Sequence, residues 1–215
     1  MDGLHFIYFA DPMCSWCWGF APVARALNER YAEVLPIRLV MGGLRPGTDR
    51  PMTAAARREI RTHWDHVREA AGQPFDYSIL DREDFIYDTD PAARAVVLVR
   101  RGNPSLALPY LERVQQAFYA EGRDVTDPAV LADLAGEFGF DQVAFLEGLS
   151  TEELKFETWR DYATSQRAGV TGFPTLIVGP NTDGTFALVS QGFQPGEPII
   201  ASIDRWLGMV QPAEA

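Results

Sequence analysis

The pattern of apolar runs and turn residues predicts that the chain begins with a strand, a helix and a second strand. Residues 4–10 are rich in aromatic and β-branched side chains and end at Asp11-Pro12, as in a buried strand. Apolar side chains then recur every three or four residues from about Cys14 to Tyr31, which indicates a helix. Residues 36–41 form the second predicted strand, and Gly42-Gly43 open a loop.

Helical periodicity dominates the middle of the chain. The predicted helices cover residues 52–71, 91–101, 105–121, 128–139, 141–149 and 151–169. Asp90 is the expected N-cap of the second of them, and Ser150, with Glu153 three residues later, is the expected cap of the last.

Strand patterns return near the end, at residues 174–178 and 185–190, with a turn between them and a helix over 197–209. The order is therefore β-α-β, a helical block, then β-β-α. This order predicts an α/β fold in which residues 1–45 and 168–215 form one split domain. Residues 46–167 form an all-helical insertion domain between its halves.

The composition restricts the classes of function. With 47% hydrophobic residues the chain can bury a core, and a formal net charge of −11 argues against binding nucleic acid or an anionic membrane surface. The sequence contains no run of about 18 apolar residues, and its start lacks the basic region of a signal peptide, so a cytoplasmic location is expected.

Two cysteines carry the clearest chemical signal. Cys14 and Cys17 lie three apart, where the first predicted strand turns into a helix. The amides at a helix N-terminus stabilise a thiolate, and residues one turn apart can form a disulfide. We therefore expect Cys14 to be an exposed nucleophile and Cys17 a buried resolving thiol. A purely structural disulfide is less favoured, because a bridge closing so short a loop stabilises little.

A second motif runs from Gly169 to Thr175, where Pro174 stands at the very start of a predicted strand. A proline there cannot donate to the sheet, and both a trans bond on an edge strand and a cis bond fit the spacing.

Together, the segment Asp11–Phe20 with its Cys-Ser-Trp-Cys motif and the segment Gly169–Thr175 resemble the thioredoxin superfamily. Within it they are similar to the DsbA-like branch, and most to its predicted cytoplasmic protein-disulfide isomerase-like members. The resemblance implies a thioredoxin fold with a helical insertion and a cis Pro174. It also implies that the backbone of Phe173 lies beside Cys14 and binds substrate.

The chain departs from the family's periplasmic oxidant at two places. Ser15-Trp16 stands between the cysteines where that oxidant has Pro-His. Without a histidine there, we expect a less oxidising disulfide. Phe173 is bulkier than the residue often found before the proline and is expected to narrow the substrate groove.

Other residues have two interpretations each. Trp16 is expected at the surface, where it could form an apolar platform for substrate. His63 and His66 could join the cysteines at zinc, but a solvated pair on a helix is favoured and no metal is predicted. Arg45 could meet a carboxylate of glutathione or simply occupy a surface turn.

The sequence thus predicts a thiol-disulfide oxidoreductase without a cofactor, acting on thiols or disulfides of proteins or small molecules, glutathione among them. A reducing cytosol favours a reductase or isomerase. The alternatives are a glutathione-dependent isomerase or transferase of the kappa-class type, and a non-catalytic binding module built on the helical insertion.

Overall fold

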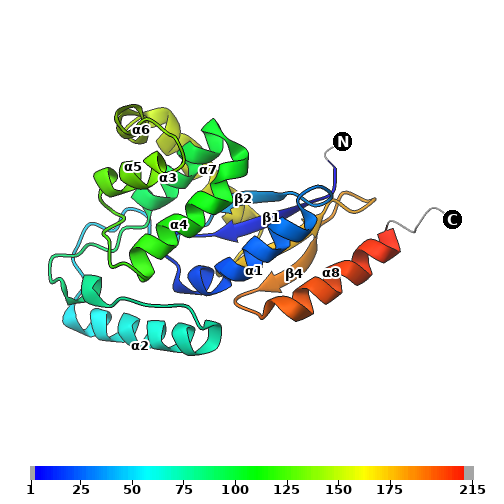
Figure 1. Ribbon diagram of the computed structural model, residues 1–215, viewed down its shortest axis with the longest axis horizontal. Helices are drawn as coiled ribbons and strands as arrows, with labels where there is room; N and C mark the ends of the chain where they lie inside the picture. Colours follow the sequence, from blue (N-terminus) through cyan, green and yellow to red (C-terminus); the bar gives the residue numbers. More distant parts are fainter. Residues whose placement is uncertain (1–2, 211–215) are drawn as a thin grey trace.

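A four-stranded sheet runs through the middle of the computed structural model, which describes residues 3–210 (Figure 1). The strand order is β2-β1-β3-β4. β1 (His5–Ala10) pairs in parallel with β2 (Ile37–Met41) and antiparallel with β3 (Thr175–Gly179), and β3 pairs antiparallel with β4 (Ala187–Gln191). The two ends of the chain therefore build one sheet.

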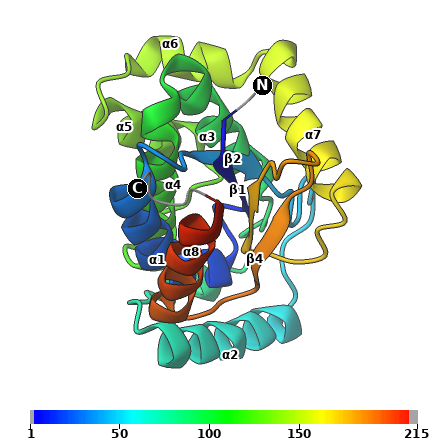
Figure 2. The same ribbon diagram turned by 90° about the vertical axis from the view of Figure 1, so that its right-hand side faces the viewer.

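Two helices cover one face of this sheet. α1 (Ser15–Tyr31) and α8 (Gly196–Val210) lie together on the same side of the strands, as Figures 1 and 2 show. Phe6 and Tyr8 of β1 point to this side and are buried with Phe20 and Leu27 of α1. Alternate residues of a strand face opposite sides, so the pattern of β1 places half of its side chains in this core.

The helical block follows β2 and returns to the sheet at its end. It comprises α2 (Ala54–Ala71), α3 (Asp90–Gly102), α4 (Ala107–Tyr119), α5 (Pro128–Gly136), α6 (Gln142–Leu149) and α7 (Glu152–Arg167), with short 3₁₀ turns at Ser78–Asp81 and Pro104–Leu106. In Figure 2, α7 lies on the side of the sheet away from α1 and α8. The mixed α/β fold with a helical insertion is confirmed.

An aromatic cluster forms the centre of the block. The ring of Trp64 in α2 lies 5.0 Å from that of Tyr119 and 5.7 Å from that of Phe118, both in α4. One continuous set of buried apolar residues joins this cluster to the sheet. The division into a split domain (residues 1–45 and 168–215) and an insertion domain (residues 46–167) therefore stays a proposal.

Two expected helix caps are wrong. Thr151 caps α7 by accepting a hydrogen bond from Leu154 N at 3.3 Å, while the Ser150 hydroxyl donates back to Glu147 O. Asp90 lies inside α3 and bonds Arg94 and Tyr162, so its carboxylate is engaged in side-chain contacts.

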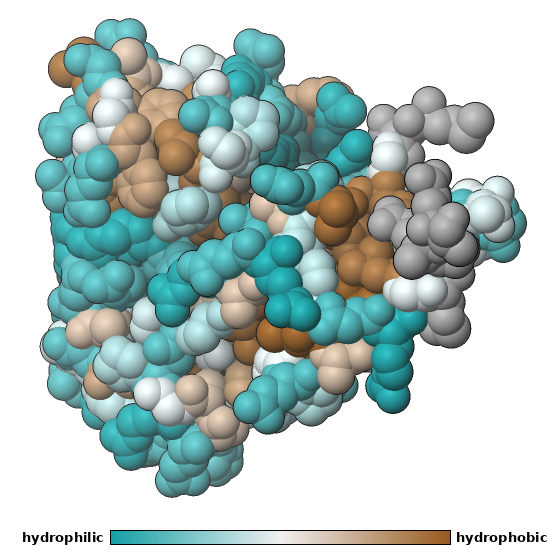
Figure 3. Space-filling view, turned by 45° about the vertical axis from the view of Figure 1, so that its right-hand side comes forward, coloured by the Kyte–Doolittle hydropathy of each residue, from teal (hydrophilic) through white to brown (hydrophobic). Residues whose placement is uncertain are grey.

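The surface reflects the acidic composition. On the face drawn in Figure 3, polar residues predominate and apolar ones gather in separate patches. The large exposed apolar side chains include Phe156 and Trp159 of α7, at 67% and 68% exposure. Within residues 3–210, no helix is long and apolar enough to cross a membrane.

Candidate active site

The turn between β1 and α1 places Cys14 at the start of a helix. Cys14 is the residue before the first turn of α1 and has an extended backbone conformation, and Trp18 N donates to its carbonyl at 3.1 Å. Upstream, Cys14 N donates to Asp11 O at 3.1 Å. The Cys14 thiol therefore lies where the free amides and dipole of α1 favour a negative charge.

The two cysteines have different surroundings. Cys17 is fully buried, whereas Cys14 retains 6% exposure, and both thiols are free. Burial raises the pKa of Cys17 well above its ordinary value, and its hydrogen bond with Cys14 raises it further. Cys17 is thus held as a neutral thiol beneath Cys14, as expected of a resolving residue.

The expectation that Cys14 is exposed is wrong, because distant parts of the chain cover it. We call this cover the wall; it consists of Phe173, Pro174 and the loop of residues 42–44. The Cys14 thiol donates to the carbonyl of Phe173 at 3.5 Å, across 159 positions of sequence. The peptide bond between Phe173 and Pro174 is cis, as the family resemblance implied.

The ring of Phe173 lies against the loop that follows β2. A Cβ atom built on Gly42 would come within 2.2 Å of Phe173 Cζ, which is closer than any real contact. A glycine at position 42 thus makes room for the large residue before the proline. The predicted narrowing of a substrate groove by Phe173 stays a prediction.

Asp11 connects the cysteine segment to the same loop, a role that was not predicted from the sequence. Its buried carboxylate accepts from Met13 N at 2.9 Å through Oδ1 and from Leu44 N at 2.8 Å through Oδ2. Burial raises the pKa of Asp11 to about 6, although these hydrogen bonds oppose the rise. The one feature of the sequence that could have indicated this role is the position of an acidic residue at the end of a predicted buried strand.

Buried tyrosines underlie the cysteine pair. The Tyr87 hydroxyl donates to Met13 O at 2.8 Å and lies 3.3 Å from the Tyr119 hydroxyl. Burial raises the pKa of Tyr8 of β1, and the neighbouring Cys17 and Cys14 raise it further. These hydroxyls fix the backbone before Cys14 and fill the space below Cys17.

The ring of Trp16 is partly covered, because two other aromatic rings contact it. Its ring stacks on Phe193 at 5.6 Å between centroids and meets His63 of α2 edge-on at 5.8 Å. The half-buried Trp16 thereby joins α1 to the helical block and to the loop before α8.

Basic groups lie on the same side of the molecule as Trp16. Burial lowers the pKa of His63, and the charges of His66 and Arg45 lower it further. Arg45 lies over the Tyr87 ring, with its guanidinium carbon 5.0 Å from the centroid. No group of three or more His, Cys, Asp or Glu residues that could hold a metal ion occurs in the described part of the chain.

The arrangement is suited to thiol-disulfide exchange. One nearly buried thiol lies at a helix N-terminus, a second lies fully buried beneath it, and a backbone carbonyl faces the first. Such a pair can form a mixed disulfide at the outer sulfur and resolve it with the inner one.

Comparisons with known proteins agree with this geometry. A crystal structure from Nitrosomonas europaea, assigned provisionally as a protein disulfide isomerase, is 35% identical, with a TM-score of 0.88 over 97% of this chain and 99% of that one. The cytosolic disulfide reductase DsbM from Pseudomonas aeruginosa is 28% identical, with a TM-score of 0.78 over 95% of this chain and 99% of DsbM. A second structure of DsbM was determined with GSH.

Among curated proteins, the ClpXP adapter protein SpxH of Halalkalibacterium halodurans is 22% identical over 79% of this chain. The chain spans 56% of the length of that relative. The family model of the DSBA-like thioredoxin domain matches residues 6–194, which include both motifs and the whole helical block. The chain therefore belongs to the DsbA-like thioredoxin family, whose fold is that of thiol-disulfide oxidoreductases.

Proposed function

We propose that this protein is a thiol-disulfide oxidoreductase that reduces or isomerises disulfides, with Cys14 as nucleophile and Cys17 as resolving thiol. The observation that carries the proposal is the difference between the two thiols. Cys14 faces the Phe173 carbonyl at a helix N-terminus, and Cys17 is buried with a raised pKa.

The reaction proceeds in two exchanges. The Cys14 thiolate attacks one sulfur of a substrate disulfide, a mixed disulfide forms, and the other substrate sulfur leaves as a thiolate. Cys17 then loses its proton and attacks Cys14 Sγ, which releases the second substrate thiol. Two electrons pass to the substrate, and a Cys14–Cys17 disulfide remains. Two molecules of a reducing thiol, such as glutathione, return it to the dithiol and form one disulfide.

The substrate site we propose comprises Phe173, Pro174 and Trp16 around Cys14. The backbone of Phe173 supplies an acceptor for an amide of a bound peptide, in the place that the Cys14 thiol occupies in the free protein. Trp16 supplies apolar surface at the edge of the site.

A small anionic thiol is the substrate class that the surroundings favour. The Arg45 guanidinium, over Tyr87, offers a planar donor for a carboxylate near Met13 and Cys14. The likeness to DsbM, one structure of which contains GSH, supports glutathione as that thiol. Because DsbM is a cytosolic disulfide reductase, the likeness also supports reduction in the cytoplasm.

The test is to equilibrate the protein in glutathione buffers, alkylate free thiols and determine masses. We expect a reversible two-electron couple between the potentials of glutaredoxin and thioredoxin, roughly −200 to −270 mV. In Cys17→Ser, a mixed disulfide with glutathione should accumulate at Cys14, and in Cys14→Ser none should form. If the two thiols never pair at any buffer ratio, the proposal fails and the kappa-class alternative takes its place.

A further inference from the structure

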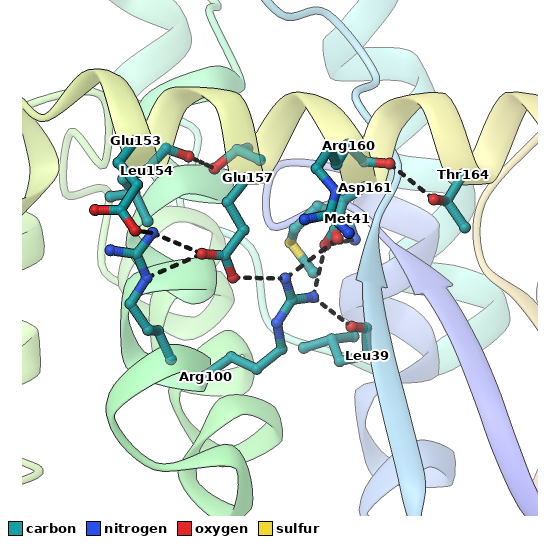
Figure 4. Close-up of polar contacts among 11 residues, drawn as sticks. Leu39, Met41, Arg100, Glu153, Leu154, Glu157, Arg160, Asp161 and Thr164 are labelled. Carbon is teal, nitrogen blue, oxygen red and sulfur yellow. Dashed lines mark hydrogen bonds and ion pairs between the residues drawn. The ribbon is translucent and has the colours of Figure 1, made fainter. Parts of the chain in front are cut away.

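Side chains, rather than another strand, cover the outer edge of the sheet at β2. Met41 N donates to Asp161 Oδ2 of α7 at 2.9 Å, and Arg100 Nη1 of α3 donates to Leu39 O at 2.7 Å. Arg100 and Asp161 also bond each other, at 2.6 Å from Nη1 to Oδ2 and 3.2 Å from Nη2 to Oδ1. Figure 4 shows the two side chains converging beside the end of β2.

This ion pair is well shielded. The side chains of Arg100 and Asp161 are 22% and 14% exposed. Charge-assisted, two-point hydrogen bonding of this kind fixes orientation as well as distance. Glu157 accepts from Arg100 at 3.5 Å and also from the neighbouring Arg101. Arg101 differs because, among the contacts described, it pairs only with Glu157 and Glu153 and with no strand backbone.

The strand that the pair holds leads directly into the wall over Cys14. Met41 is followed by Gly42, whose N donates to Ala10 O at 2.7 Å and which lies against the Phe173 ring. Two residues later, Leu44 N donates to Asp11. A shift at the end of β2 would therefore move both contacts.

The helix that carries Asp161 leads to the same wall. The residue after Asp161 is Tyr162, whose ring lies so close to Gly43 that a Cβ there would come within 2.8 Å of it. The Tyr162 hydroxyl donates to Asp90 at 3.0 Å. α7 ends at Arg167, and the chain then runs to Phe173, the acceptor of the Cys14 thiol.

We infer that Arg100 and Asp161 are positioning residues for Cys14. Their ion pair locks β2 to α7 and thereby sets the spacing between the loop of residues 42–44 and the loop that carries Phe173. Neither residue touches a reacting atom. The inference deepens the proposed function and rests on it, because it assigns what holds the substrate-binding wall in place.

The variants Arg100→Met and Asp161→Asn test the inference, with Arg101→Met as the matched control. We expect both to lose about tenfold in kcat/KM for a disulfide substrate, mainly through a higher KM, because small misplacements of binding groups are costly. Arg101→Met should stay within twofold of the unmodified protein. Arg100→Lys should recover part of the loss, because one ammonium can pair with Asp161 but lacks the planar fork.

Hydrogen exchange gives a readout that does not need activity. At amides of Gly42 and Leu44, we expect roughly tenfold faster exchange in Arg100→Met and Asp161→Asn and no change in Arg101→Met. Faster exchange in a protein that shows no disulfide exchange at all would overturn the proposed function and leave the positioning role standing. If folded Arg100→Met and Asp161→Asn keep kcat/KM and these exchange rates within twofold of Arg101→Met, the positioning role is refuted.

Discussion

The two sides of the site, the segment of residues 11–18 and the wall that faces it, are built in different ways. The first is a single stretch of chain in which a strand end, a tight turn and a helix start place both cysteines. The wall combines the loop of residues 42–44 with Phe173 and Pro174, which come from opposite ends of the chain. The nucleophile is thus encoded locally, while its covering depends on long-range contacts.

Asp11 belongs to the first region and binds the second, so its charge should affect stability most. Its pKa in the folded protein is about 6, above the ordinary 3.8. Between these values the folded protein binds more protons than the unfolded chain. The free energy of unfolding should therefore fall as pH rises from about 3 to 7, by roughly 3 kcal/mol from this residue. Urea unfolding across this range measures the slope.

Asp11→Asn should remove that slope, because an amide does not titrate. Asp49→Asn is the matched control, since the Asp49 side chain is 88% exposed and should leave the slope unchanged. Equal pH slopes in Asp11→Asn and the unmodified protein would contradict the role given to Asp11.

Within the wall, the contact of Gly42 with Phe173 is the tightest. Gly42→Ala would place a methyl group 2.2 Å from Phe173 Cζ and should cost about 2 kcal/mol of stability, as overpacking does. Adding Phe173→Ala should relieve the clash, so the two changes together should cost less than their sum. Thermal or urea unfolding of the four proteins measures this coupling.

The control for this cycle is Gly208→Ala, at an exposed position of α8 with nothing near its added Cβ. It should stabilise the helix by up to about 1 kcal/mol. Strictly additive losses of stability in Gly42→Ala and Phe173→Ala would show that the Phe173 ring is not the reason why position 42 requires a glycine.

The smallest effect is expected below the cysteine segment, at Tyr87. Tyr87→Phe removes the hydrogen bond to Met13 O and leaves a buried carbonyl without that donor, which should cost about 1–2 kcal/mol. Tyr119→Phe removes only the 3.3 Å contact with Tyr87 and should cost less. Unfolding midpoints rank the two, and the reverse order would show that Tyr87 does not support the Cys14 turn.

The same division explains what could be predicted from the sequence. The cysteine pair at a strand-to-helix turn, the proline at the start of β3 and the order of elements follow from local patterns, and the structure has each of them. The burial of Cys14, the packing of Phe173 on Gly42 and the hydrogen bond from Leu44 N to Asp11 depend on residues far away in the chain. The spacing of residues along the sequence does not indicate which distant residues will face them in the folded site.

Two smaller differences have separate causes. Ser150 and Thr151 are adjacent and both can cap a helix, so only the geometry separates them. Trp16 was expected at the surface and is half-buried, because the distant residues Phe193 and His63 contact its ring.

The distance in sequence between Cys14 and Phe173 has a consequence for how the protein is made. The two residues are 159 positions apart. At about 5–20 residues per second, the ribosome needs roughly 8 to 32 seconds to produce the acceptor of the Cys14 thiol after Cys14 itself. During synthesis the thiols therefore emerge well before Phe173, and until then Cys14 lacks the backbone acceptor that covers it in the folded protein.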